Sequence, residues 1–430
     1  MSSQYRANLL TGLSLFSRVL GLGTIVLMAL CAQALALPGE AGAQGTARDE
    51  EIAGLAEGLA IQEAFELIEA QDARTLEELI FLTEIPAPPF QEEERARAYA
   101  DMLSAAGADS VKLDEVGNVL AFRRGRVGSR TVVLGAHLDT VFPEGTDVTV
   151  ERRGDTLFAP GVGDDTRGLI VVLAVLRAMA ETDITTDANL IFLGSVGEEG
   201  LGDLRGVKHF FRDGGPQADA FIEVDGGGMA GQVSMALGSV RYRVTFRGEG
   251  GHSWGAFGLA NPAHALGRAI EHFSVVADAL TETGPRTSFN VGRIGGGTSI
   301  NSVPFEAWME VDMRSESPQS LETIEAAFLA AVDQATEEEN EFLRQGSPLE
   351  VDVERIGLRP SGETDPESPL VQRAEAVTRY LGDEPRLSRS STNSNIPISL
   401  GIPAVTIGRG GAGGQNHSPD EWWVNIDGYK

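Results

Sequence analysis

The stretch Thr131-Val-Val-Leu-Gly-Ala-His-Leu-Asp139 places an uncharged, largely apolar run directly before a histidine and an aspartate. Such a run predicts a strand that is buried on both faces of its sheet. Working outward, a nearly all-apolar helix is expected over 169–176, and further short strands over 189–194, 220–224 and 402–407. Short apolar strands with helices between them are typical of a mostly parallel sheet, so the sequence predicts an α/β fold.

Side chains able to bind a metal follow these predicted strands or precede the predicted apolar helix. In chain order they are His137, Asp139, Asp164, Asp165, Glu198, Glu199, Asp225 and His417. Because ligands bind outside the carboxyl ends of the strands in open α/β sheets, one edge of the sheet would gather these groups. Imidazole together with carboxylate is the ligand set of hydrolytic zinc, cobalt or manganese.

Each motif also has an ordinary explanation when it is taken alone. A His-x-Asp pair can form a surface hydrogen bond, and paired glutamates after a strand usually lie in a solvated turn. Paired aspartates before a helix favour its N-terminus. Asp225 stands before glycines and suits a turn, and His417 suits an ordinary loop. The prediction of a metal site therefore depends on all the motifs converging at one edge.

The composition limits both the partners and the kind of metal site. The chain has 430 residues, with 63 Asp and Glu against 34 Lys and Arg, and a formal net charge of −29. Such an acidic balance argues against nucleic acid and anionic lipid as partners. A single cysteine can form neither an intrachain disulfide nor a zinc ribbon. A metal site must therefore be built from His, Asp and Glu.

Residues 1–36 are predicted to be a signal peptide. Arg6 and Arg18 precede an apolar run over 19–30, and the small-residue motif Ala34-Leu35-Ala36 follows. A basic start, an apolar middle and small residues at a cleavage position define such a signal. We therefore expect an exported protein, periplasmic or secreted, with no membrane contact after cleavage.

Other outcomes stay open for this terminus. A second cleavage position follows Ala43. An uncleaved membrane anchor is the main alternative, although the apolar run is short and is broken by glycines and Gln33. Lipid modification of Cys31 is disfavoured, because Leu30 is large where a small residue is expected.

The pattern changes over residues 238–349, which indicates an inserted domain. Apolar residues alternate with arginine and threonine over 240–247, as in a strand with one solvated face. A helix capped by Asn261, two further strands and a helix starting at Ser317 follow. This order predicts a small α+β layer of ferredoxin-like type.

The rest of the chain is divided into an N-terminal segment and an α/β domain. Residues 37–70 are expected to form a linker, rich in Gly, Ala and acid over 37–50, and an N-terminal helix. Residues 71–237 together with 350–430 are expected to form the α/β domain that carries the predicted metal site.

Taken together, the motifs resemble the di-zinc exopeptidase and deacylase family. This family includes peptidase T, carboxypeptidase G, carnosinase-type dipeptidases, acetylornithine deacetylase and succinyl-diaminopimelate desuccinylase. The similar stretches are collinear, and they are 135–142, 161–168, 197–199, 222–226, 250–253, 301–304, 391–392 and 417–418. The resemblance implies a metallohydrolase of amide bonds, with the insert as a lid and as the interface of a homodimer.

The resemblance also implies a ligand for each metal position. His137 and Asp225 would bind one divalent ion, Glu199 and His417 would bind a second, and Asp164 would bridge the two. Zinc is expected first, with cobalt or manganese as alternatives.

Catalytic roles follow from the same resemblance. Glu198 would be the general base, which takes a proton from water and returns it to the leaving amine. Asp139 would orient the ring of His137. His252, usually from the partner subunit in this family, would stabilise the oxyanion, although a histidine in a glycine-rich hairpin needs no such role.

Asn301, Arg314 and Arg409 are the candidates for substrate binding. Asn301 and Arg314 would hold the backbone or carboxylate of the substrate, for which the bidentate fork of arginine is suited. Arg409 is a weaker candidate for the same task. Arg314 shares a strand face with Asp312, so a structural ion pair is the competing explanation.

The activity expected from these features is that of an exported, metal-dependent exopeptidase acting on small peptides. In this family an aspartate at the position of Asp225 tends to accompany aminopeptidases, dipeptidases and tripeptidases. Residues 137–142 are instead similar to the glutamate carboxypeptidase branch, so a carboxypeptidase or an N-acyl-amino-acid deacylase is the alternative. A catalytically silent metal-binding module is disfavoured by Glu198, and a phosphoesterase by the lack of a basic cluster.

The chain departs from the family pattern in a few places. Many relatives have Lys-Gly-Gly where this chain has Thr166-Arg167-Gly168, and many have Asp where Asn393 stands. Relatives also usually continue into a closing helix, whereas this sequence ends at Lys430. Neither the 166–168 stretch nor Asn393 is a metal position, so these two departures put fine specificity in doubt more than activity.

Overall fold

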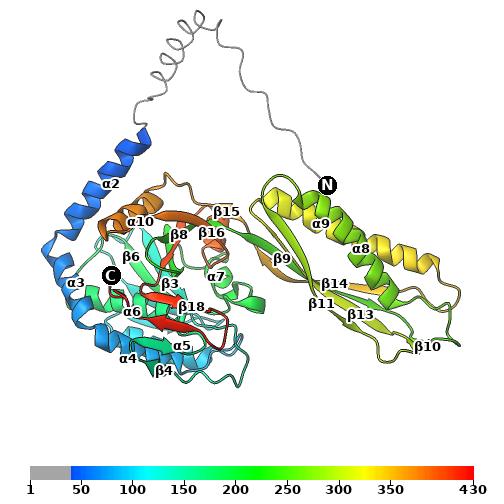
Figure 1. The fold of residues 1–430 in the computed structure, drawn as a ribbon. Helices are drawn as coiled ribbons and strands as arrows, with labels where there is room; N and C mark the ends of the chain where they lie inside the picture. Colours follow the sequence, from blue (N-terminus) through cyan, green and yellow to red (C-terminus); the bar gives the residue numbers. More distant parts are fainter. Residues whose placement is uncertain (1–39) are drawn as a thin grey trace, which may run out of the picture. The chain divides into compact units, whose positions relative to one another are not determined.

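The computed structural model describes residues 40–430, and the signal peptide predicted over 1–36 lies outside this range. The described part begins with helix α2 (Glu40–Ala56), which covers most of the linker expected over 37–50 (Figure 1). That linker prediction is wrong from Glu40 onward, because alanine and glutamate are strong helix formers. Within residues 40–430, no helix is both long enough and apolar enough to cross a bilayer.

A large mixed sheet organises the chain outside the insert. Its central strands lie parallel in the order β6, β3, β7 and β17, with antiparallel neighbours on both sides. The strands are β1 (Ser110–Leu113), β2 (Val119–Arg123), β3 (Thr131–His137), β6 (Asn189–Ser195), β7 (Ala220–Gly226), β8 (Gly231–Ala236), β15 (Gly362–Glu363), β16 (Arg386–Ser390) and β17 (Ala404–Gly408). The fold is therefore a mixed α/β fold with a large, mostly parallel sheet, as predicted.

Helices cover this sheet on both faces. They are α3 (Leu59–Ala70), α4 (Asp72–Thr83), α5 (Glu93–Ala105), α6 (Thr166–Glu181), α7 (Arg205–Phe210), α10 (Pro369–Tyr380) and α11 (Asn395–Ser399). Phe192 and Leu193 are adjacent in β6 but belong to different apolar cores, one containing Leu173 of α6 and the other Phe210 of α7. Burial on both faces is the reason why these strands are unbroken apolar runs.

The insert forms a separate antiparallel sheet in the order β11-β13-β9-β14 (Figure 1). Its elements are β9 (Gly238–Arg247), α8 (Pro262–Thr281), β11 (Thr287–Gly296), β13 (Glu306–Ser315), α9 (Pro318–Glu341) and β14 (Glu350–Arg359). The side chains of Asn261 and Ser317 cap α8 and α9, as the sequence indicates. Met309 and Met313 of β13 are buried with Phe328 of α9, so the helices cover only one face of the sheet.

Strand β14 places the end of the insert later than expected. It pairs with β9 along its length, so the inserted sheet ends at Arg359 rather than at residue 349. Most side chains of β14 are exposed, because it is an edge strand that alternates Val351 and Val353 with acids. Because of this mixed composition, the apolar pattern of the sequence does not predict β14 as a strand.

One two-stranded pairing and one small four-stranded sheet contain the other strands of the described chain. Strands β10 (Gly251–His252) and β12 (Ser302–Val303) pair in the insert. A further sheet joins β4 (Glu151–Arg153), β5 (Thr156–Phe158), β19 (Trp422–Val424) and β18 (Ala412–Gly414). The sequence analysis predicts none of them, yet the last sheet carries the loop with His417 toward the strand ends.

Candidate metal centre

The predicted ligands come from different elements that meet at one edge of the large sheet. His137 is the last residue of β3, and Asp225 lies near the end of β7. Glu199 follows β6, and Asp164 stands in the loop before α6. His417 comes from the loop between β18 and β19. The carboxyl ends of the parallel strands thus bring residues far apart in sequence to one place, as expected for this kind of sheet.

Asp164 lies at the centre of the cluster. In the described chain, ligand atoms within 4.8 Å of one another group His137 with Asp164 and Asp225, and Asp164 with Glu199 and His417. The Nε2 atom of His137 is 3.3 Å from Oδ1 of Asp164, and Nε2 of His417 is 3.4 Å from its Oδ2. The two carboxylate oxygens of Asp164 therefore face different imidazoles, which is the arrangement that a bridging ligand requires.

The electrostatics of the cluster fit divalent cations. Burial raises the pKa of Asp225 to about 8, and the Asp164 carboxylate adds to this effect. Burial also raises the pKa of Glu198 to about 7, although the Arg359 guanidinium acts in the opposite direction. Buried carboxylates at this density are costly unless positive charge balances them. His, Asp and Glu donors are also the ones that zinc and manganese accept, so the residues present fit such ions.

Asp139 holds the backbone of the paired glutamates. Its carboxylate accepts hydrogen bonds from the amides of Glu198 (2.9 Å) and Glu199 (2.8 Å). Nδ1 of His137 lies 3.0 Å from the carbonyl oxygen of Asp139 and 3.6 Å from its carboxylate. The fully buried Asp139 thus touches both the histidine that it was expected to orient and the chain that carries the expected base.

Glu421 positions the loop that carries Asp164, and the sequence analysis did not find it. Its buried carboxylate accepts hydrogen bonds from the amides of Gly161 (2.9 Å), Gly163 (2.9 Å) and Asp164 (2.8 Å). The sole sequence signal is its position four residues after His417. A carboxylate bonded to successive amides fixes the loop conformation from which Asp164 projects.

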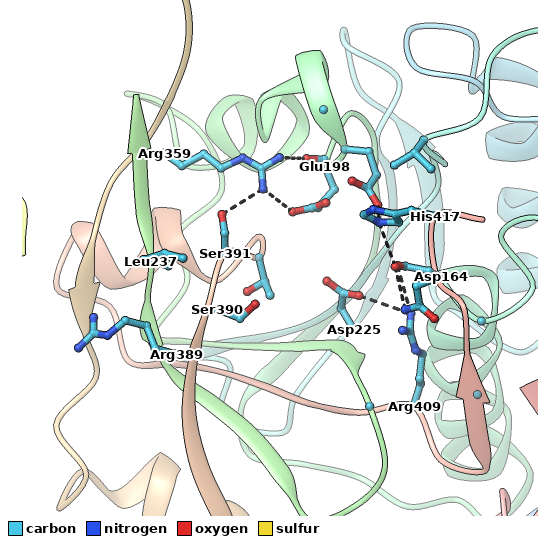
Figure 2. A pocket seen from close by; sticks show the side chains of 18 of the residues that line it. Asp164, Glu198, Asp225, Leu237, Arg359, Arg389, Ser390, Ser391, Arg409 and His417 are labelled. Atoms are coloured by element: carbon cyan, nitrogen blue, oxygen red, sulfur yellow. Dashed lines mark hydrogen bonds and ion pairs between the residues drawn. The ribbon is translucent and has the colours of Figure 1, made fainter. Parts of the chain in front are cut away.

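Arg359 is the second residue that the sequence analysis missed. Its Nη1 donates to Oε1 of Glu198 at 3.0 Å and to Oγ of Ser391 at 3.1 Å, and its Nη2 donates to the carbonyl of Glu198 (Figure 2). Both side chains of the Arg359–Glu198 pair are 6% exposed. Nothing local in the sequence indicates this contact, because the partners are 161 residues apart.

Arg409 lies among the expected metal ligands. Its Nη1 is 3.2 Å from Asp164 and 3.5 Å from Asp225 (Figure 2). It is also 3.4 Å from Asp165. These carboxylates outweigh the effect of burial and raise the pKa of Arg409 above its ordinary value. Arg409 also lines the cavity that opens over the cluster, and it supplies positive charge to the acids.

The remaining predicted residues are placed less directly. Arg314 lines the cavity, but its Nε donates to Asp312 at 2.7 Å, so the competing ion pair is present. His252 and Asn301 lie close to each other at the β10–β12 pairing, where the amide of Ser253 donates to the carbonyl of Asn301 at 2.8 Å. Neither residue lines the cavity, and both are exposed.

The positions that depart from the family pattern have structural partners. Nδ2 of Asn393 donates to Glu223 at 2.6 Å and to Ser195 at 2.9 Å. Arg167 lies over the ring of Trp423 and donates to backbone carbonyls. These contacts support the strands and loops behind the cluster, which agrees with a limited effect on the metal positions.

A cavity of about 680 Å³ opens over the cluster. It is lined on one side by Asp164, Glu198, Glu199, Asp225 and His417, and elsewhere by Arg241, Arg314, Arg359, Arg389, Ser390, Ser391 and Thr392. Cavities of ~300–1,000 Å³ are usual for small-molecule sites. The volume therefore suits a small-molecule site.

The fold and the acid–imidazole cluster define a metallohydrolase. The chain belongs to peptidase family M20/M25/M40, whose sequence profile matches residues 133–429. Members of this family hydrolyse amide and peptide bonds, and this chain is one of these hydrolases.

Individual relatives extend the comparison. The chain is 24% identical to an uncharacterized protein of Bacillus subtilis, over 79% of this chain and 91% of that one. It is 28% identical to the succinyl-diaminopimelate desuccinylase of Corynebacterium glutamicum, over 54% of this chain and 64% of that enzyme. The structure of a tripeptidase from Staphylococcus aureus is similar in fold, with a TM-score of 0.67, 23% identity and coverage of 83% of this chain and 94% of that one.

Proposed function

We propose that this protein is an exported, metal-dependent exopeptidase that releases the N-terminal residue of dipeptides and tripeptides. The observation that carries the proposal is the convergence of Asp164, Glu199, Asp225 and His417 on the lining of one cavity, with Glu198 beside them and His137 buried against Asp164. An aspartate at position 225, rather than a glutamate, favours a peptidase over a deacylase. Export is supported by the signal-like sequence of residues 1–36 alone.

The cluster would hold two divalent ions, with zinc expected first. His137, Asp164 and Asp225 would hold one, and Asp164, Glu199 and His417 would hold the other. When bound, such ions polarise a carbonyl group and lower the pKa of water.

The protein's own groups would carry the proton and hold the substrate. Glu198 would accept a proton from water on its carboxylate and deliver it to the leaving amine. Asp139 would keep Glu198 and Glu199 in place through their amides. Arg314, at the cavity wall, would meet the carboxylate of the peptide, because an arginine fork binds such a group in bidentate fashion.

A homodimer is proposed to form through the insert. Trp254, Phe257 and Ile300, near the β10–β12 pairing, are large apolar residues with little cover in the single chain. Association that covers them would also explain why His252 and Asn301 lie outside the cavity of their own chain. In that arrangement His252 of the partner subunit would stabilise the oxyanion.

A carboxypeptidase or deacylase activity is the second candidate. The arginines of the cavity wall, Arg241 and Arg314, favour it, because a substrate with a blocked N-terminus would be held chiefly by its carboxylate. Both activities would use the same ligands and the same base.

The test is metal analysis followed by a substrate panel. The purified protein should contain about two divalent ions per chain. It should release free amino acids from dipeptides and tripeptides with a free N-terminus, and a chelator should stop this release. Turnover of N-acyl amino acids alone would contradict the proposal and would show that the protein is a deacylase. Bound metal without any turnover would contradict both and support a metal-binding role.

A further inference from the structure

Two chain crossings connect the large sheet to the insert. Leu237 joins β8 to β9, and Pro360 and Ser361 join β14 to β15. Nδ2 of Asn395 donates to the carbonyls of Leu237 (2.8 Å) and Pro360 (3.0 Å). A Cβ on Gly238 would lie 2.8 Å from the Cβ of Ser361, so the two crossings are in close contact. We call these two adjacent crossings the joint.

The loop that carries Glu198 is tied to the insert strands beside this joint. Arg359, the last residue of β14, donates to the carboxylate and to the carbonyl of Glu198. The amide of Leu358 donates to the carboxylate of Asp203 at 3.0 Å. Nη1 of Arg241, from β9, donates to the carbonyl of Gly200 at 2.9 Å. Both strands that enter the joint thus contact the segment 198–203.

The Arg359–Glu198 contact differs from an ordinary surface ion pair. Both side chains are buried, and Arg359 bonds both the carboxylate and the backbone of the same residue. A carboxylate held in this way has its direction fixed relative to its own main chain. Removing one partner of a buried pair leaves the other charge without compensation, so the tie is not readily replaced by solvent.

We propose that Arg359 is the positioning residue for Glu198, so that the placement of the base depends on where strand β14 of the insert lies. The inference rests on the proposed function, which makes Glu198 the base. Arg359 would affect catalysis only by positioning the carboxylate of Glu198. Movement of the insert at the joint would shift Arg359, and with it the carboxylate that receives the proton.

The test compares substitutions of Arg359 with a control on the same strand. Arg359→Ala should lower kcat about 100-fold, because misplacement of a reacting group by about 1 Å costs that much. KM and metal content should stay within a factor of about three of wild type. Arg359→Lys keeps one charged donor and should recover part of the loss. Arg355→Ala, whose side chain is 51% exposed and 3.8 Å from Glu325, should leave kcat unchanged.

Other results would overturn the positioning role. An unchanged kcat in Arg359→Ala would contradict it. A raised KM with an unchanged kcat would make Arg359 a substrate-binding residue instead. A lowered melting temperature with normal kcat in the folded fraction, together with no benefit from Arg359→Lys, would make it a purely structural residue.

Hydrogen exchange separates this inference from the proposed function. Arg359→Ala should speed amide exchange over residues 197–203, whereas Arg355→Ala should not. If wild type hydrolyses nothing in the panel, the proposed function fails, and the exchange measurement still decides whether Arg359 holds the loop. Equal rates of amide exchange over residues 197–203 in both variants would contradict the positioning role of Arg359, whatever the activity.

Discussion

In the large sheet the acidic side chains at the strand ends are buried together, whereas in the insert they lie along an open face and form ion pairs with arginines. Across β9 and β13, Arg241 pairs with Asp312 at 2.8 Å, Arg243 with Glu310 at 2.6 Å, and Arg247 with Glu306 at 3.3 Å, and the members of each pair lie directly opposite each other on the two strands. The acids around Asp164 share one short-range cluster instead.

The difference shows that burial, more than residue type, distinguishes functional charge from structural charge. Exposed ion pairs contribute only ~0–1 kcal/mol, since water already solvates both partners. Buried carboxylates raise the free energy of the folded chain until cations balance them. The acids of the large sheet are therefore expected to respond strongly to metal and substitution, and those of the insert only weakly.

Metal removal should give the largest effect. A chelator should abolish hydrolysis and lower the melting temperature, because ions that bind only the folded state stabilise it by about 4 kcal/mol at a thousand times Kd. Calorimetry and activity measured before and after readdition of zinc check both effects. An unchanged melting temperature and full activity in excess chelator would place the function outside the cluster.

Substitution of the base should come next. Glu198→Gln should lower kcat by about 10²–10⁴-fold, the usual contribution of a general base, with metal content unchanged. Glu310→Gln makes the same change on the open face of the insert, where Glu310 pairs with Arg243, and should leave kcat unaltered. Comparable losses in both variants would remove the distinction between the two regions.

Loss of the Glu421 carboxylate should have an intermediate effect. Glu421→Gln removes one acceptor oxygen from the amides of Gly161, Gly163 and Asp164. Metal affinity should fall by about 10–100-fold, as for other groups that orient a ligand. Competition with a chromophoric chelator measures it, and Asp420→Asn, the exposed neighbour, is the control. Unaltered affinity would mean that the loop needs no such support.

A pair on the open face should have the smallest effect. A double-mutant cycle with Arg247→Ala and Glu306→Ala should give a coupling of about 0.2–1 kcal/mol in the free energy of unfolding. The coupling should shrink in high salt, because exposed charges are screened. Urea unfolding at two salt concentrations checks both points. A coupling above that range, insensitive to salt, would show that burial is not what separates the regions.

The parts of the fold that the sequence predicts are those with a local signal. The strand expected over 131–136 is observed as β3 (Thr131–His137), because a fully buried strand must be apolar throughout. The caps Asn261 and Ser317 are likewise found where expected, since capping depends on residues within one turn. His137 and Asp225 stand directly after predicted strands, so these two candidate ligands have a local signal, whereas His417 lies in a loop between two strands that the sequence does not predict.

The parts that the sequence could not predict depend on long-range contacts or on exposure. Arg359 and Glu421 contact residues that are 161 and 257 positions away, and neither differs locally from a surface residue. Strand β14 is an exposed edge strand. Its pairing with β9, rather than its composition, specifies its strand conformation. The helix α2 over the expected linker is not predicted, because a glycine-containing, acidic stretch is typical of irregular chain.

The adjacent crossings have a consequence for how such a chain could arise. Ala236 pairs with Gly362 in the large sheet, and Ser239 pairs with Arg359 in the insert, so both pairs follow one antiparallel register and lie three residues apart along each strand. A single genetic event could therefore exchange the whole layer for another, or for a tight hairpin turn, without reordering the host strands. Any replacement would inherit the metal ligands intact, but it would have to bring its own arginine to Glu198.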